Sequence, residues 1–92
     1  MPKVVVTAQV EEPVRWEEGF RTHGELFRSY TVDTPVTFGI TEGNEVAICL
    51  EPADLDAFTA GMESAATAEA MEADGINRDT VKVFIMDKEF QP

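Results

Sequence analysis

The chain has 92 residues and one cysteine, which suits one small domain without an internal disulfide framework. Eighteen acidic against seven basic residues give a formal net charge of −11, which repels phosphate backbones and argues against a nucleic-acid partner. No signal peptide is visible and no apolar stretch approaches a membrane span, so residues 1–92 are expected to form a single cytoplasmic domain.

The first elements expected are a strand over residues 3–10 and one long helix over residues 11 to about 29 or 30. Pro13 suits the first turn of a helix, because its missing N–H is not needed there. Gly19 and Gly24 weaken the helix slightly without ending it.

A β-hairpin is expected next, with alternating strands over residues 36–41 and 46–50 around a tight turn at residues 42–45. Pro52 ends the hairpin. Asp54 is expected to cap or charge the start of the following helix.

A second helical stretch, residues 53–73, is expected in two pieces, because Gly61 interrupts it and Ser64 can cap a new start. Asp74–Gly75 ends it, and the last strand is expected over residues 80–88. The order β-α-β-β-α-β indicates an α+β, ferredoxin-like fold. Its antiparallel sheet has the expected order 4-1-3-2, with two helices on one face and the second helix broken.

The two faces of the predicted sheet differ. The inner face is strongly apolar and is expected to carry the helices. It holds Val4, Val6, Phe38, Ile40, Val46, Ile48, Leu50, Val81, Val83 and Ile85. The outer face is largely uncharged at its centre, which is typical of an interface, so we expect a homodimer formed by stacking two such faces. Besides Thr37 and Gly39, this outer face holds the residues through which the dimer is expected to form: Val5, Thr7, Ala47, Cys49, Phe84 and Met86.

An aromatic stripe is the best indication of a pocket in this sequence. Its members recur at helical spacing and fall within an arc of roughly 80°. They are Trp16, Phe20, His23, Phe27 and Tyr30. So much aromatic surface must be covered by the sheet or by a ligand, and the stripe is expected to bind an apolar or aromatic molecule.

His23 is the only histidine and the simplest candidate for a catalytic acid or base near neutral pH. Polar companions are expected from Thr41, Glu42 or Asp87 at strand ends. The alternative is a histidine packed in the core, with one ring nitrogen bonded to a carbonyl or to water. One histidine and one cysteine, Cys49, cannot supply a typical zinc or non-haem iron site, so no metal is expected.

The chain resembles the dimeric α/β-barrel superfamily, which includes antibiotic-biosynthesis monooxygenase-like and stress-responsive barrel proteins. The features that carry the resemblance are Trp16, Phe20 and Phe27, the hairpin around Gly43, the broken stretch from Phe58 to Gly75 with Ser64, Ala70 and Met71, and the strand Val81–Lys82–Val83–Phe84. The resemblance implies two subunits that pair their sheets into a barrel, each with a pocket between helices and sheet. Members include cofactor-free oxygenases, isomerases and haem-degrading enzymes.

The haem-degrading members combine an asparagine, a tryptophan and a histidine, and this pattern does not carry over. Trp16 and His23 share one predicted helix, while Asn44 and Asn77 fall in turns. A haem ligated by His23 is therefore the third and weakest hypothesis, and no cofactor is expected.

Two further functional hypotheses stay open. The first is a small-molecule protein, with a cofactor-independent monooxygenase or isomerase activity in which His23 is the base. It requires an actual cavity, whose wall Met62 and Met71 could shape as flexible side chains. The second is a non-catalytic structural or interaction dimer, in which the stripe is merely core.

Overall fold

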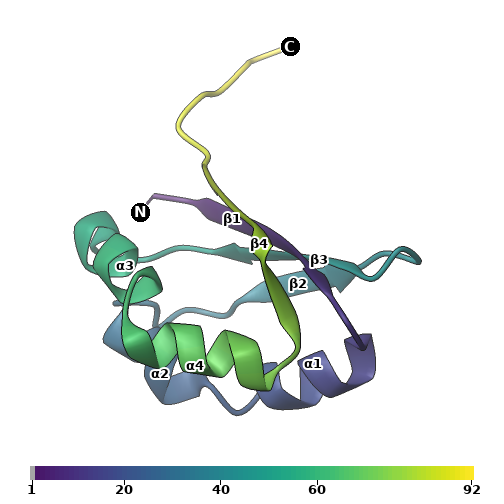
Figure 1. Ribbon diagram of the computed structural model, residues 1–92. Coiled ribbons are helices and arrows are strands. Elements are labelled where there is room, and N and C mark those ends of the chain that lie inside the picture. Colours follow the sequence, from purple (N-terminus) through teal and green to yellow (C-terminus); the bar gives the residue numbers. More distant parts are fainter. Residues whose placement is uncertain (1) are drawn as a thin grey trace.

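The computed structural model describes residues 2–92 as a four-stranded antiparallel sheet of order β2-β3-β1-β4, with four helices on one face (Figure 1). This is the predicted α+β, ferredoxin-like arrangement, and the predicted strand order is confirmed. The elements are β1 (Val4–Val10), α1 (Pro13–Phe20), α2 (Gly24–Ser29), β2 (Thr37–Ile40), β3 (Glu45–Leu50), α3 (Leu55–Met62), α4 (Ala65–Ala73) and β4 (Ile76–Ile85).

The first helical stretch is two helices, so the prediction of one continuous helix was wrong. Pro13 does occupy the first turn of α1. After Phe20 the chain tightens, because the N–H of Thr22 donates to the carbonyl of Gly19 and that of His23 donates to Phe20, both three residues back. The Thr22 hydroxyl also donates to Gly19, at 2.6 Å. These bonds replace the α-helical pattern, and His23 then precedes α2.

The second helical stretch has the predicted break. Asp54 caps α3 by accepting from two backbone N–H groups, and the Ser64 hydroxyl accepts from the Thr67 N–H to start α4. Gly75 follows α4 with φ of +74°, the left-handed conformation that glycine adopts without strain. The predicted caps and stop are therefore confirmed.

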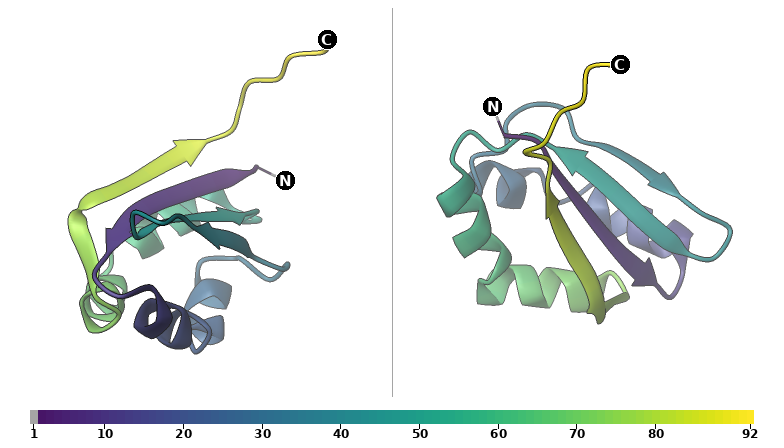
Figure 2. Two further views of the ribbon diagram at one scale, coloured as in Figure 1. Left: turned by 90° about the vertical axis from the view of Figure 1, so that its right-hand side faces the viewer. Right: turned by 90° about the horizontal axis from the view of Figure 1, so that it is seen from above.

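The last strand begins earlier and ends earlier than predicted. Ile76 and Asn77 already pair with the end of β1, opposite Val10 and Gln9. The pairing then shifts at a bulge opposite Ala8, where β4 bends sharply (Figure 2, left). At the other end, residues after Ile85 have little of β1 left to pair with, because β1 itself begins at Val4.

The core lies between the inner sheet face and the helices. Five of the ten predicted inner-face residues are buried, among them Val4, Val46 and Leu50 at 0–2% exposure, and two more are partly buried. Ile40, Val83 and Ile85 are 39–47% exposed, so their predicted coverage by the helices was wrong. The outermost strands, β2 and β4, extend beyond the helical layer.

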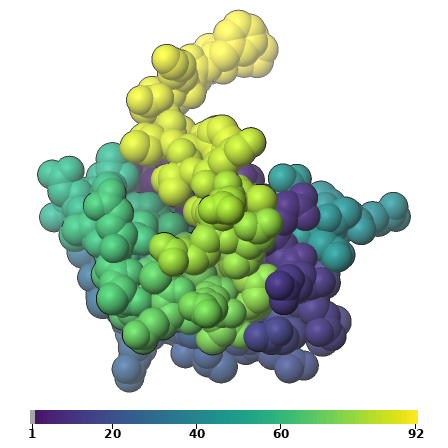
Figure 3. All heavy atoms as spheres, viewed as in Figure 1, coloured from purple at the N-terminus to yellow at the C-terminus, as the bar shows by residue number. Residues whose placement is uncertain are grey.

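The six predicted outer-face residues lie next to one another on the sheet. Val5 is paired with Cys49 on one side and with Phe84 on the other, and Thr7 is paired with Ala47. No helix in residues 2–92 covers this face, and Phe84 and Met86 are 47% and 54% exposed. The N–H of Met86 still donates to the carbonyl of Lys3, and the C-terminal end of the chain beyond it projects away from the rest of the molecule (Figure 3).

Among the described residues, none of the helices has the length and apolar character needed to cross a membrane.

Candidate functional site

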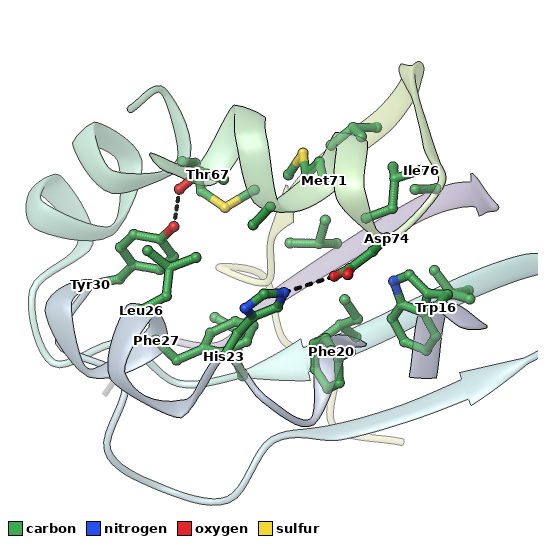
Figure 4. Close-up of a pocket in the computed structure, with 18 residues that line it drawn as sticks. Trp16, Phe20, His23, Leu26, Phe27, Tyr30, Thr67, Met71, Asp74 and Ile76 are labelled. Carbon is green, nitrogen blue, oxygen red and sulfur yellow. Dashed lines mark hydrogen bonds and ion pairs between the residues drawn. The ribbon is translucent and has the colours of Figure 1, made fainter. Parts of the chain in front are cut away.

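A pocket lies between the helices and the inner face of the sheet (Figure 4). Its volume is about 70 Å³ and its wall is almost wholly apolar. The lining side chains come from β1, β3 and β4 on the sheet side and from all four helices opposite. All five members of the aromatic stripe are among them, so the hollow that the sequence required is present at the expected place.

The aromatic stripe forms one continuous wall although the helix beneath it is broken. Trp16 stacks on Phe20 with 4.9 Å between ring centroids. Phe20 meets Phe27 edge to face at 5.3 Å, and Phe27 meets Tyr30 in the same way at 6.0 Å. Trp16 is 0% exposed and Tyr30 is 3% exposed, so the two ends of the wall are fixed by the core.

His23 lies near the middle of this wall and is paired with a carboxylate. Its Nε2 atom is 2.8 Å from Oδ2 of Asp74, the residue that ends α4. The side chains are 24% and 10% exposed, respectively. The histidine is therefore partly open to solvent, whereas its partner is almost enclosed.

Local structure on two elements places Asp74 beside His23. The left-handed Gly75 terminates α4, and Arg15 donates to the carbonyl of Ala73 at 2.7 Å, which ties the end of α4 to α1. Gly19 makes room for the carboxylate, because a Cβ atom there would lie 2.7 Å from Cγ of Asp74.

A cluster of hydroxyl groups occupies the opposite end of the pocket. The Thr67 hydroxyl donates to the carbonyl of Gly61 at 2.6 Å, so the Tyr30 hydroxyl donates to Thr67. Ser64 joins the cluster at 3.1 Å from the Thr67 oxygen. Burial raises the pKa of Tyr30 above its ordinary 10.0, and a hydrogen bond with Ser64 offsets part of this.

Trp16 presents an unused hydrogen-bond donor. Its Nε1 atom is buried and has no partner among the described residues. In Figure 4 this nitrogen lies on the side of the indole that faces Asp74. Because a buried N–H group without an acceptor is unfavourable, this edge of the pocket suits an oxygen atom of a ligand.

A larger groove adjoins the pocket. It has a volume of about 440 Å³ and lies between α3, α4 and the exposed inner side of β4. Met62, Met71 and Val81 line both the pocket and the groove, so they form the partition between them. Two of these three residues are methionines, whose unbranched side chains change conformation easily.

Some of the predicted site residues line the pocket and others do not. Met62 and Met71 are in the pocket wall as anticipated, but Thr41, Glu42 and Asp87 do not line it. The partner of His23 is instead Asp74, which was predicted only to end the preceding helix. The position of Asp74 indicated a residue with a special role, because a carboxylate at a helix C-terminus opposes the helix dipole, but it did not indicate His23 as the partner.

The described residues contain no group of three or more histidine, cysteine, aspartate or glutamate side chains able to hold a metal ion.

Fold and pocket together define an α+β protein of the ferredoxin-like class with a small apolar cavity under its helices. Its fold is shared with antibiotic biosynthesis monooxygenase proteins of known structure. A Bordetella bronchiseptica protein described as a candidate antibiotic biosynthesis monooxygenase superposes with a TM-score of 0.74 at 12% identity, over 97% of both chains. SnoaB, a cofactor-independent oxygenase from Streptomyces nogalater, superposes with a TM-score of 0.70 at 16% identity, over 98% of this chain and 94% of that one.

An Arabidopsis thaliana protein gives a TM-score of 0.68 at 13% identity, over 100% of this chain and 99% of that one. No protein-family model and no curated protein matches the sequence. At these identities the comparisons show the fold, and the resemblance drawn from the sequence is confirmed at that level.

Proposed function

We propose that the protein binds a flat, largely apolar molecule in this pocket and oxygenates it without a cofactor, with His23 as the base. The observation that carries the proposal is the cavity itself, bordered by His23 and by the unpartnered indole N–H of Trp16. The fold shared with SnoaB, a cofactor-independent oxygenase, supports the reaction class.

The size of the cavity limits how a ligand can bind. A dry cavity of about 150 Å³ is known to admit benzene, so about 70 Å³ is too small for a fused aromatic ring system in its present form. The adjoining groove offers about 440 Å³ behind Met62 and Met71. We therefore propose that the ligand displaces these two side chains and occupies the pocket and part of the groove.

The proposed chemistry uses dioxygen as the oxidant. His23 removes a proton from an activated methylene group of the substrate, and the resulting carbanion is oxidised by O₂. One oxygen atom becomes the new carbonyl oxygen of the substrate. The other leaves as water with the two hydrogens of the methylene group, so that substrate and O₂ give ketone and H₂O. An oxygen already on the substrate would accept a hydrogen bond from Trp16.

Binding is tested by nuclear magnetic resonance with anthrone, a flat aromatic ketone with an activated methylene group, in anaerobic buffer. Trp16 is the only tryptophan, so its indole N–H signal is unambiguous. We expect this signal to shift saturably. Ala70→Leu, which fills the pocket, is expected to abolish the shift, whereas Ala66→Leu on the exposed side of the same helix is expected to preserve it. An unmoved indole signal at saturating anthrone contradicts the proposal.

Turnover is tested by oxygen uptake with anthrone in air. His23→Gln keeps an N–H group for Asp74 but provides no base, so we expect uptake to fall by roughly 10²-fold or more with binding preserved. Equal uptake by the wild-type protein and His23→Gln would show that His23 is not the base. Binding without any accelerated uptake would favour the non-catalytic alternative.

We also propose that two copies associate through the outer sheet face. Within residues 2–92 no element covers the face formed by Val5, Thr7, Ala47, Cys49, Phe84 and Met86, and this face includes two large exposed apolar side chains. Two such faces stacked about a two-fold axis would bury one another with a single self-complementary surface. The shared fold agrees with this mode of assembly.

A further inference from the structure

Asp74 occupies a position that is unfavourable for a carboxylate. It follows the last turn of α4, where the free carbonyl groups give the helix end a partial negative charge. Its side chain is also only 10% exposed, so water solvates the carboxylate poorly. Among residues 2–92 its ion-pair partner is His23. The unfavourable position of this carboxylate must be offset by a favourable contact, and the group that it contacts is the imidazole of His23.

The opposing helix is shaped to receive this carboxylate. Gly19 lies in α1 directly against Asp74, and a Cβ atom at that position would overlap the carboxylate group. Glycine weakens a helix interior relative to alanine, and no backbone strain requires it here, since its φ is not positive. The glycine therefore serves the close approach of Asp74 to α1, and with it the contact to His23.

We propose that Asp74 is the positioning residue of His23 and fixes which imidazole nitrogen is the base. This inference rests on the proposed function, in which His23 removes a proton. An ionised carboxylate can only accept hydrogen bonds, so the 2.8 Å contact requires a proton on Nε2. The neutral ring is then held as the Nε2–H tautomer, and its lone pair is on Nδ1.

The geometry gives the two nitrogens different tasks. Nε2 is directed at the nearly enclosed carboxylate, and Nδ1 lies on the opposite side of the ring (Figure 4). The imidazole as a whole is 24% exposed, so a proton taken up on Nδ1 can pass to solvent. While Nδ1 takes up a proton, the Nε2–H group stays bonded to the Asp74 carboxylate, so the ring keeps its orientation.

The tautomer is tested on the ligand-free protein by ¹⁵N nuclear magnetic resonance. The chain has one histidine, so its ring signals need no assignment. At neutral pH we expect one tautomer, with a directly observed Nε2–H proton protected from solvent exchange. In Asp74→Asn the exchange of this proton is expected to quicken about tenfold or more, and the tautomers to mix, because a charge-assisted hydrogen bond is lost. Glu72→Gln, an exposed change on the same helix, is expected to match the wild type.

A second pair of variants tests the arrangement from the opposite helix. Gly19→Ala is expected to displace Asp74 and give the spectrum of Asp74→Asn, although alanine itself favours the helix. A Cβ atom at Gly24 would meet only the flexible end of the Arg28 side chain, so Gly24→Ala is expected to leave the His23 signals unchanged.

A proton on Nδ1 in the neutral wild type, or an unchanged tautomer and exchange rate in Asp74→Asn, overturns the inference. These measurements need no ligand. The anthrone titration can therefore fail while the tautomer is confirmed, and the tautomer can be wrong while anthrone binds.

Discussion

Tyr30 is the residue at which burial has the clearest chemical consequence. Its ring closes one end of the aromatic wall, and its hydroxyl group is satisfied by Thr67. Burial raises the pKa of this phenol above 10.0, because the phenolate would be poorly solvated there. The folded state therefore holds the phenolic proton more tightly than the unfolded chain does.

This raised pKa predicts how stability changes in alkali. The contribution of the neutral phenol to the free energy of unfolding is fully present below pH 10.0. It is lost as the pH rises through the higher pKa of the folded state. Tyr30 is the only tyrosine, so the absorbance of tyrosinate reports this group directly. We expect its midpoint to lie above 10.0 in the native protein and near 10.0 in urea.

The matched variant is Tyr30→Phe, which retains the ring and removes the titrating group. Its free energy of unfolding is expected to fall less steeply with pH above 10.0 than that of the wild type. Identical slopes for the two proteins would show that the hydroxyl group is not held in a buried environment.

The residues of the site also show where sequence reasoning succeeds. The aromatic stripe was predictable, because Trp16 to Tyr30 follow helical spacing and all five residues reach one pocket despite the broken helix. Asp74 was not identified as the partner of His23, since 51 residues separate the two in sequence. They come together only because the C-terminal end of α4 lies against α1, and no local pattern in the sequence indicates that contact.

Among the helices and strands, boundaries with a local cause were predictable from the sequence, whereas boundaries that depend on long-range pairing were not. The start of α4 at Ser64 was predictable because a capping side chain acts within its own turn. The early start of β4 was not, because Ile76 becomes a strand residue by pairing with Val10. The break before α2 was also missed, although Gly24 lies there, because helix propensity alone only lowers stability at a glycine.

The approach of α3 to Tyr30 provides a prediction at this scale. A Cβ atom at Gly61 would lie 2.9 Å from Cγ of Tyr30 and would overlap the outer ring atoms. Gly61→Ala is therefore expected to lower the free energy of unfolding by about 1–3 kcal/mol through overpacking. Urea denaturation measures the change.

Gly43→Ala is the control for this substitution. Its Cβ atom would meet nothing closer than 3.8 Å, in the turn between β2 and β3, and little change is expected. Equal stabilities of Gly61→Ala and Gly43→Ala would show that α3 does not pack closely on the tyrosine.

At the scale of the whole molecule, the fold leaves the two sides of the sheet unequal. Helices cover the inner face and enclose the candidate site, whereas no helix of the described part of the chain covers the outer face (Figure 1). Both copies of a dimer would carry a formal charge of −11. Their long-range repulsion opposes association at low ionic strength, and salt screens it over about 10 Å at 0.1 M. The proposed dimer must therefore be held by apolar contact, and salt should strengthen it.

The assembly is tested by measuring the mass in solution at several protein and salt concentrations. We expect a species of twice the 10.2 kDa chain mass, with a dissociation constant that falls as salt is added. Ala47→Lys places a charge at the centre of the outer face and is expected to weaken association at least about tenfold, or about 1.4 kcal/mol. Ala60→Lys, at an exposed residue of α3, is expected to leave the dimer intact. A monomer at all concentrations would show that the chain does not form the proposed dimer, and equal effects of the two lysines would place the interface elsewhere.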